Sequence, residues 1–332
     1  MELKKLGVII LNWNGRKLLE EFLPIAVRYT LNENVDLVVA DNGSTDGSPD
    51  WIETNFPQVR LIRFDRNYGF AEGYNRAIES TRYPYTILLN SDVEVTEDWW
   101  RPLLQTMESN PDIGACQPKI RSYKERDKFE YAGAAGGYLD RLGYPYCRGR
   151  LFDSIETDHG QYDSELSDIA WASGAALMVR TSAYLEVGGL DADFFAHMEE
   201  IDLCCRMYRG GWRVVADPRS FVYHVGGASL SQGNPQKTFL NFRNNLLLLH
   251  KNLPKAKGRR ILFLRRLADS LAWLMFVAKL DFANARAIIR AHNDFRRMRK
   301  KYTDLPASDY LSTLPGADRL IVVDRFLLRK KK

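Results

Sequence analysis

Apolar runs and helical patterns alternate along the first third of the chain. Uninterrupted apolar or β-branched stretches are typical of buried strands in a parallel sheet. Helical patterns follow the first three runs, over Lys17–Val27, after Pro49, and up to Ile78. The predicted strands are Leu6–Leu11, Val35–Ala40, Val59–Phe64 and Thr86–Leu89. Strands that alternate with helices in this way predict an α/β fold with a mostly parallel central sheet covered by helices.

Two of the predicted strands end abruptly in a carboxylate. Asp41 follows the second strand and opens a glycine- and hydroxyl-rich turn, and Asp92 follows the fourth. Ligands of open α/β sheets bind where strands end. Asp92, helped by Asn90 or Ser91, could anchor Mg²⁺ or Mn²⁺ beneath a diphosphate. Asp41 could accept the N3–H of a uracil or thymine ring. A polar turn at Asp92 and an Asx turn or helix cap at Asp41 are the alternatives.

The middle of the chain is less regular. From Gln117 to about Asp168 it is rich in Gly, Tyr and charge without a clear period. A stretch of this length without regular structure is usually functional, so we expect a lid or acceptor loop, with a hairpin near Tyr131 to Tyr146. Trp171 follows, where it could stack on a sugar ring or pack in the core.

A second group of acids opens a predicted helix. From Glu199 to Arg209 the pattern is helical, and Glu199, Glu200 and Asp202 lie in its first turn. Acids at this position suit the helix dipole, so capping is one interpretation. Carboxylates crowded beside apolar neighbours also raise one another's pKa, which can leave one of them poised as a general base.

Four motifs follow one another along the first third of the chain. They are Asn12-Trp13-Asn14, the run from Asp41 to Ser48, Asn67 to Ala71 with Asn75, and Leu89-Asn90-Ser91-Asp92. As an ordered set they resemble the inverting family 2 glycosyltransferases of GT-A fold, and within them the rhamnosyltransferase-like branch of bacterial surface polysaccharide synthesis. The resemblance covers roughly residues 6–250.

The resemblance implies a role for each matched position. In similar enzymes the second acid of a Glu-Asp-x-Asp/Glu motif is the base, which is Glu200 here; Glu199 is the alternative, and Asp202 would orient the loop or an acceptor group. His224 matches a histidine that completes the metal or diphosphate site, and it precedes a predicted glycine turn that runs to residue 229. Trp171 and Gly174 lie in a segment that lines the acceptor site. The implied donor-binding residues are Asn12, Asn14, Asp41, Asn42, Ser44, Asn67, Gly69, Phe70, Asn75, Asn90, Ser91, Asp92, Arg243 and Asn244.

Charge divides the chain into two predicted parts. Residues 1–235, the expected catalytic domain, hold 24 Lys/Arg against 35 Asp/Glu, whereas residues 236–332 hold 23 against 7. This basic, apolar-rich and helical extension suggests an anionic partner. Its segment Ile261–Leu280 is interrupted by charges, so we expect it to lie on a membrane surface and not to span the bilayer. A solvated helical face, packing on the catalytic domain and a homodimer contact are alternatives.

Other function classes fit the sequence less well. The chain lacks the dinucleotide-binding pattern GxGxxG and the phosphate-binding pattern GxxxxGK[ST]. Their absence argues against an ordinary dehydrogenase and a P-loop NTPase, respectively. The loop Asn12–Arg16 does not resemble the Gly-rich loop of enzymes that make nucleotide-sugars. No RNA-binding signature supports a nucleic-acid-binding scaffold. Four cysteines without paired spacing indicate a reducing cytosol. We therefore expect a cytoplasmic enzyme at the inner face of the plasma membrane, acting on a nucleotide-diphospho-sugar and a glycan or lipid-linked glycan.

Overall fold

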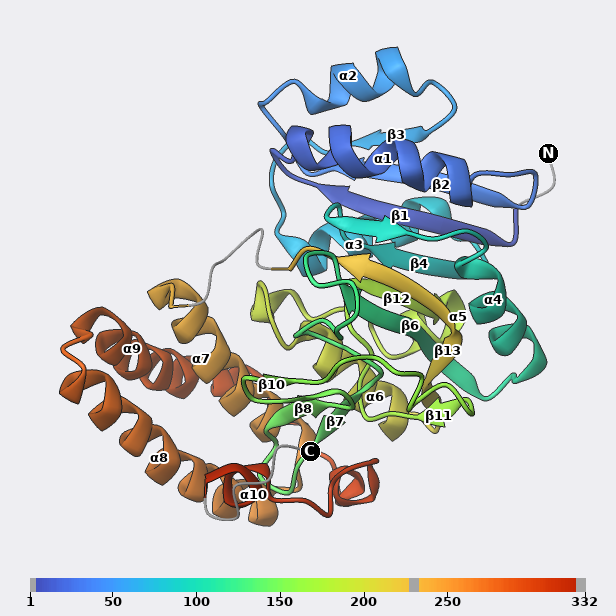
Figure 1. Cartoon of the computed structure of the whole chain (residues 1–332). Helices are drawn as coiled ribbons and strands as arrows, with labels where there is room; N and C mark the ends of the chain where they lie inside the picture. The colour runs from blue at the N-terminus through green and yellow to red at the C-terminus, as the bar shows by residue number, and fades with distance from the viewer. Residues whose placement is uncertain (1–3, 227–232, 327–332) are drawn as a thin grey trace.

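The computed structural model describes residues 4–226 and 233–326. Its centre is a nine-stranded sheet with the order β11-β13-β6-β12-β4-β1-β2-β3, in which β5 pairs with β13 (Figure 1). The strands of this sheet are β1 (Leu6–Asn12), β2 (Val35–Asp41), β3 (Arg60–Arg63), β4 (Tyr85–Leu89), β5 (Val93–Val95), β6 (Ile113–Ser122), β11 (Ser167–Asp168), β12 (Ala176–Arg180) and β13 (Arg213–His224).

The first half of the sheet is parallel, as the sequence predicts. Strands β3, β2, β1 and β4 run in one direction, and their parallel register pairs Asn12 with Asp41 at the ends of β1 and β2. The second half is mixed, because β12 is antiparallel to both β4 and β6. β5 is also antiparallel to β13, with Val93 opposite His224. This pairing brings the end of the long strand β13 beside the acidic end of β4.

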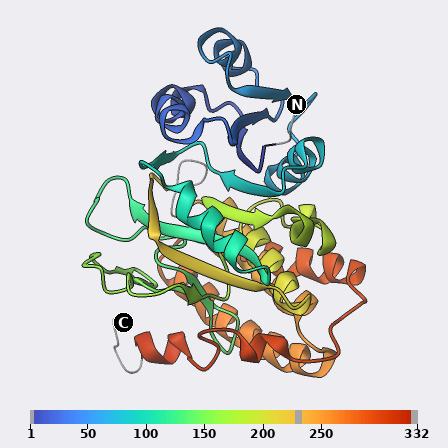
Figure 2. The same ribbon diagram turned by 90° about the vertical axis from the view of Figure 1, so that its right-hand side faces the viewer.

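Helices cover both faces of the sheet (Figures 1 and 2). Apolar side chains of α1, α2 and α4 form one buried cluster with the sheet, and those of α3, α5, α6 and α7 form another. Alternate residues of β1 belong to opposite clusters, as expected of a strand buried on both faces. These helices are α1 (Arg16–Thr30), α2 (Ser48–Asn55), α3 (Phe70–Thr81), α4 (Trp100–Ser109), α5 (Thr181–Glu186), α6 (Glu199–Arg209) and α7 (Pro235–Asn252).

The irregular segment between β6 and β12 forms a small antiparallel sheet beside the main one. The hairpin predicted near Tyr131 to Tyr146 is present as β7 and β8. The strands of the small sheet are β7 (Gly137–Leu139), β8 (Pro145–Cys147), β9 (Arg150–Leu151) and β10 (Ser154–Ile155). The glycine turn predicted after His224 reaches residues 227–229, which lie outside the described residues.

The C-terminal part is helical, as predicted. α7 packs against α6 and against α8 and α9, and its leucines Leu246–Leu249 belong to the main core. Packing on the catalytic part therefore accounts for this apolar run, while a domain boundary at residue 235 stays a prediction. Within residues 4–226 and 233–326, no helix has both the length and the apolar character to cross a membrane. The remaining helices are α8 (Lys255–Ala278), α9 (Phe282–Met298) and α10 (Ile321–Phe326).

Candidate functional site

The ends of β1 and β2 form the first wall of the site. Asn12 Nδ2 donates to Asp41 Oδ1 at 2.9 Å and to Ser48 Oγ at 2.8 Å, and the Ser44 backbone N–H donates to Asp41 Oδ2 at 2.9 Å. Asp41 is 2% exposed. The carboxylate of Asp41 therefore stabilises the turn that follows β2, in line with the Asx turn named above as the alternative to base recognition. Each carboxylate oxygen can accept a further hydrogen bond, so recognition of a pyrimidine base stays a prediction.

The loops that follow these strands are tied to one another. Asn14 Oδ1 accepts from the Thr45 backbone N–H at 2.8 Å, and Ser44 Oγ accepts from the Asn14 N–H at the same distance. Asn42 Nδ2 donates to Asn67 Oδ1 and to the Gly69 carbonyl, both at 3.0 Å. The structure therefore brings together the predicted donor residues of three loops.

Asn75 lies apart from this group. Its Oδ1 accepts from Tyr184 Oη at 2.5 Å and from the Leu190 N–H at 3.0 Å, while its Nδ2 donates to the Leu190 carbonyl at 2.8 Å. These contacts hold the segment after α5, and they use one of the two N–H groups of the amide. The direct donor contact of Asn75 stays a prediction.

Asp92 and His224 meet at the other end of the same sheet edge. His224 Nε2 lies 3.2 Å from Asp92 Oδ1, and Nδ1 lies 3.6 Å from Glu130 Oε2, a residue that the sequence did not single out. All three side chains are buried. Burial alone lowers the pKa of His224, but the two carboxylates outweigh it and raise the value to about 10.

The donor set of Asp92 and His224 fits a divalent cation that takes most of its ligands from a substrate. Among the described residues no three His, Cys, Asp or Glu side chains are arranged to hold a metal by themselves. Mg²⁺ commonly binds through one or two carboxylates together with substrate phosphates and water. Carboxylate suits Mn²⁺ better than imidazole does, so Asp92 would be the stronger ligand of the two. Asp92 and His224 are therefore the residues that would hold the predicted ion, which would bind His224 in its neutral form and displace the proton.

A strained loop precedes the acids of α6. Phe195, His197 and Met198 all have positive φ, at 65°, 67° and 75°. Such values are uncommon for residues other than Gly and cluster at functional sites. Asn244 Nδ2 donates to the carbonyls of Ala196 and His197 at 2.8 and 2.7 Å. The loop is thus fixed in its strained form by α7.

Arg243, the neighbour of Asn244, binds the same loop. Its Nη2 donates to the Phe194 carbonyl at 2.9 Å, its Nε donates to Asn244 Oδ1 at 2.8 Å, and Nη1 lies 3.3 Å from Asp294. The pair predicted to face the diphosphate therefore positions the loop from behind. A direct phosphate contact of Arg243 and Asn244 stays a prediction, and it would require these contacts to be exchanged.

The first turn of α6 holds two carboxylates with unused oxygens. Oε2 of Glu199 and Oε2 of Glu200 are buried without a hydrogen-bond partner, as is Nε2 of His197. Burial raises the pKa of Glu200 to about 7. Burial, and then the charge of Glu200, raise the pKa of Glu199 well above its ordinary value, whereas burial lowers that of His197 to about 4. Unpartnered buried polar atoms are rare, and their clustering marks a place where a ligand is expected.

Asp202 is different, because its carboxylate is fully paired. Oδ2 accepts from Arg206 Nε and from Lys251 Nζ, both at 2.7 Å, and Oδ1 accepts from Asn252 Nδ2 at 2.8 Å. Burial would raise the pKa of Asp202, but Arg206 and Lys251 keep it below the ordinary value. The group therefore stays ionised and engaged, which suits the orienting role and not that of the base.

One turn joins the two halves of the site. The carbonyl of Ala175 accepts from the Asn90 N–H at 3.0 Å, next to Ser91 and Asp92. A Cβ added at Gly174 would lie 3.5 Å from the Phe70 ring and 3.9 Å from Glu200 Cβ. The acids of α6 and the end of β4 therefore flank the same turn.

Trp171 packs in the core. It is 3% exposed, its Nε1 donates to the Tyr138 carbonyl at 2.9 Å, and its ring packs on Gly137. This arrangement matches the core-packing interpretation given above, and the acceptor contact of Trp171 stays a prediction.

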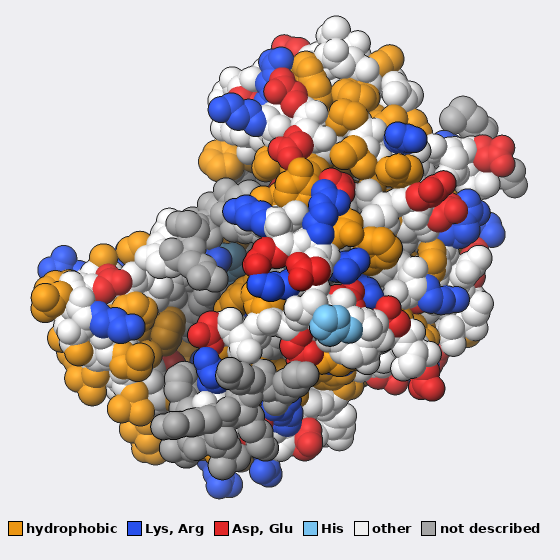
Figure 3. All heavy atoms as spheres, viewed as in Figure 1, with side chains coloured by type: hydrophobic (Ala, Val, Ile, Leu, Met, Phe, Trp, Pro, Cys, Tyr) orange, Lys and Arg blue, Asp and Glu red, His pale blue; other side chains and the backbone are white. Residues whose placement is uncertain are grey.

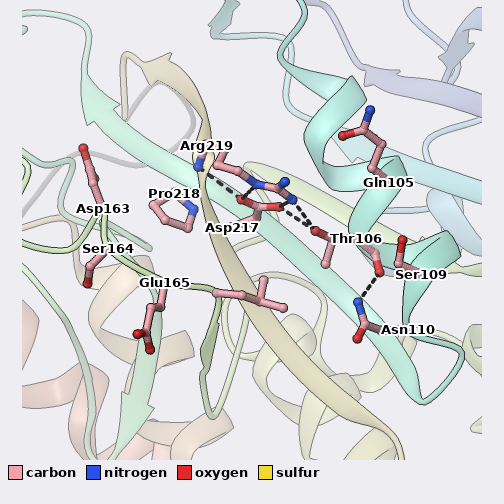
Figure 4. Close-up of a pocket in the computed structure, with 11 residues that line it drawn as sticks. Gln105, Thr106, Ser109, Asn110, Asp163, Ser164, Glu165, Asp217, Pro218 and Arg219 are labelled. Carbon is pink, nitrogen blue, oxygen red and sulfur yellow. Dashed lines mark hydrogen bonds and ion pairs between the residues drawn. The ribbon is translucent and has the colours of Figure 1, made fainter.

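A separate cavity lies away from these residues. It has a volume of about 500 Å³ and opens between α4, residues 163–166 and residues 217–219 (Figure 4). Its inner carboxylate, Asp217, accepts from Thr106 Oγ1 at 2.6 Å and from Arg219 Nη2 at 2.7 Å. These polar groups hydrogen-bond to one another, whereas Glu199 and Glu200 of α6 each have an oxygen without a partner. None of the predicted site residues lines this cavity.

Residues that the sequence did not reveal also face the site. Glu130 lies in the irregular middle segment, 94 positions before His224, where no pattern marks it. His197 lies two residues before Glu199, and the scarcity of histidine, with five in the whole chain, was the available signal. Lys237 on α7 is close enough to interact electrostatically with both of them.

The chain is similar to several proteins of known class. Residues 7–171 match the family described as "Glycosyl transferase family 2". Over 244 residues the chain is 31% identical to an N-acetylglucosaminyl-diphospho-decaprenol L-rhamnosyltransferase of Mycobacterium tuberculosis, covering 66% of this chain and 75% of the relative. Over 263 residues it is 22% identical to a low-salt glycan biosynthesis hexosyltransferase of Haloferax volcanii, covering 77% and 79%.

Solved structures show the fold. The mannosyltransferase PcManGT of Pyrobaculum calidifontis, in complex with GDP-Man and Mn²⁺, aligns with a TM-score of 0.52 and 17% identity over 94% of this chain and 80% of that one. S. aureus TarS 1-349 in complex with UDP-GlcNAc aligns with a TM-score of 0.57 and 16% identity over 88% and 80%. The GT-A fold predicted from the sequence is confirmed.

Proposed function

Because this chain belongs to glycosyl transferase family 2, we propose that it moves a sugar, with inversion, from a dTDP- or UDP-linked donor to a hydroxyl of a glycan or lipid-linked glycan during cell-surface polysaccharide synthesis. The relative from Mycobacterium tuberculosis is named for rhamnosyl transfer to a lipid-linked diphosphate acceptor, which supports an acceptor of this class. The proposal is carried by one observation. Glu199 and Glu200, at the start of α6, each have a buried oxygen without a hydrogen-bond partner, and they lie beside the turn at Gly174 and Ala175 that also binds the end of β4.

Glu200 is the proposed base. Its pKa of about 7 lets it be ionised at neutral pH while it remains basic enough to accept a proton. The acceptor hydroxyl oxygen forms the new bond to the anomeric carbon, its proton passes to Glu200, and the bond to the nucleoside diphosphate breaks on the opposite face. Burial and the charge of Glu200 raise the pKa of Glu199, which favours its protonated form, and in that form it can donate a hydrogen bond.

The donor would lie along the ends of β1, β2 and β4. Asn12 and Asp41 are at the end expected to hold the base, and Asp92 with His224 is at the end expected to hold the diphosphate. A divalent cation bound by Asp92 and His224 would supply positive charge to the departing diphosphate. Asp202 and Asn244 hold α6 and its loop in place, so that Glu200 keeps its position during transfer.

Thermal unfolding tests the donor site directly. The protein is heated with UDP, dTDP, GDP or CDP, each with and without Mn²⁺. A ligand at about 100 times its dissociation constant adds roughly 2.7 kcal/mol of stability, which shifts the midpoint visibly. We expect a Mn²⁺-dependent shift with a pyrimidine diphosphate that Asp92→Ala abolishes.

The control variant is Glu33→Ala, because Glu33 is an exposed acid outside the site. It should retain the full ligand-induced shift. An absence of any shift in the unmodified protein, or an equal shift in Asp92→Ala, would contradict the proposed donor site. Release of pyrophosphate from a nucleoside triphosphate would instead identify an enzyme that makes nucleotide-sugars.

A further inference from the structure

Helix α8 carries a continuous apolar face that no described part of the chain covers. Its members recur at steps of three or four residues, with an adjacent pair at each end, so they fall on one side of the helix. Leu271 is 63% exposed and Phe263 is 59% exposed, which is unusual for side chains of this size when they are clustered. We call this set the α8 stripe: Phe263, Leu264, Leu267, Leu271, Leu274 and Met275, all at least 40% exposed.

The opposite side of α8 fixes its orientation. Ile261 and Leu262 are buried in the main core. Asp269, the single acid of the helix, points inward, where Oδ2 lies 3.0 Å from His292 Nε2 of α9 and Oδ1 lies 3.8 Å from Arg265 Nη2. The stripe faces outward because both the apolar and the ionic contacts of α8 are made on its other side.

The exposed apolar surface continues beyond α8. Leu280 and Phe282, in the connection to α9, are 75% and 51% exposed, and Ile289 of α9 is 49% exposed. Figure 3 shows hydrophobic side chains gathered along the lower left edge of the molecule, over α8 and α9. The stripe is therefore part of a larger apolar surface and not a set of isolated side chains.

Positive charge surrounds this surface. Residues 259–290 contain seven Lys/Arg and two Asp. Arg259 and Arg260 lie at the beginning of the stripe and Lys279 at its end, and all three are exposed. Of the two acids, Asp269 is buried, and Asp281 caps α9 by accepting from the Asn284 N–H at 3.1 Å. The rim of the stripe thus favours an anionic partner.

We propose that the α8 stripe lies in the interface of an anionic phospholipid bilayer, with its basic rim at the headgroups. An amphipathic helix with Phe and Leu on one face and Lys or Arg beside them binds in this way, and each basic residue near an anionic surface strengthens the attraction. A second copy of the chain fits less well, because both ends of the stripe are basic. A twofold contact would bring like charges together whether the helices paired in parallel or antiparallel.

Flotation with lipid vesicles tests this proposal on the full chain. Vesicles of phosphatidylcholine containing phosphatidylglycerol are compared with vesicles of phosphatidylcholine alone. We expect binding to the first, at least tenfold weaker binding to the second, and weaker binding at high salt. The variant Leu267→Ser/Leu271→Ser/Leu274→Ser should lose binding at least tenfold. These side chains are exposed, so its thermal midpoint should stay close to that of the unmodified protein.

The matched control replaces three exposed apolar residues elsewhere, Ile155, Leu166 and Leu185, with Ser; it should float like the unmodified protein. Equal flotation of the stripe variant and the control, or no flotation of the unmodified protein, would overturn the proposal. A dimer in sedimentation equilibrium that the stripe variant dissociates would assign the surface to a second copy. The nucleotide-induced thermal shift of the stripe variant is measured in parallel, which separates a failure at this surface from a failure of the proposed transfer activity.

Discussion

Replacement of Glu200 by Gln is the most informative single change, because it separates the base from its surroundings. Gln has nearly the same shape but carries no charge. The pKa of Glu200 is raised from 4.5 to about 7 by burial. The folded state therefore binds more protons than the unfolded state between these values, and stability falls as the pH rises through this window. Above pH 7 the loss amounts to about 3 kcal/mol, since each pKa unit corresponds to about 1.4 kcal/mol.

Two measurements follow from this reasoning. In urea unfolding, Glu200→Gln should be about 3 kcal/mol more stable than the unmodified protein near pH 8 and similar to it near pH 4. In transfer assays, kcat/KM of the unmodified enzyme should fall as the pH drops through about 7, because the base becomes protonated. The variant should lose about 10²–10⁴ in rate, and its remaining activity should lack this pH dependence.

Glu186→Gln on α5 is the matched control, because that carboxyl is exposed; it should leave both profiles unchanged. A stability gain in Glu200→Gln that is equal at both pH values would refute the buried-charge reasoning. Turnover within a fewfold of the unmodified enzyme would refute its role as the base. In that case Glu199→Gln becomes the decisive variant.

Three further predictions concern the support of the site. Asp202→Asn should lower the free energy of unfolding by about 3–5 kcal/mol in urea, because it removes the carboxylate partner of Arg206 and one of the two carboxylates bound to Lys251; a loss below 1 kcal/mol would contradict this. Gly43→Ala should lower the free energy of unfolding by about 1–3 kcal/mol, because Gly43 has φ of 73° and an added Cβ would lie 2.6 Å from backbone atoms. Gly188→Ala is the control and should lower it less, because Gly188 has φ of 84° but no atom within 4 Å of an added Cβ. Glu130→Gln should weaken Mn²⁺ about 10–100-fold in thermal titrations, because a partner of His224 is lost; unchanged Mn²⁺ affinity would exclude this supporting role.

The pattern of apolar residues was sufficient to predict the parallel strands in the first half of the sheet. Strands β1, β2 and β4 begin and end within a residue of the predicted limits, since each is a continuous apolar run closed by a polar turn. β3 is shorter than predicted because its side chains are only partly buried. The antiparallel direction of β12 could not be predicted, because a buried strand has the same composition in either direction.

The sequence indicated which residues lie near the site more reliably than it indicated which partners their side chains bind. Asp92 and His224 were expected near one another and are, but Glu130 joins them from a segment without periodicity. Asn75 and Arg243 match family motifs, yet their side chains bind the protein's own backbone. Sequence spacing does not specify which of several nearby partners a long polar side chain chooses, since that depends on loops whose conformation is set by distant contacts.

The antiparallel pairing of β5 with β13 has a consequence for engineering. His224 stands opposite Val93, so its distance from Asp92 is set by the hydrogen-bond register of two strands. A shift by one residue would turn His224 to the other face of the sheet. The side-chain contacts that join the loops at Asn14, Asn42 and Asn67 lie outside this strand pairing. Loops grafted from other family members should therefore change which donor is accepted while the positions of Asp92 and His224 stay the same.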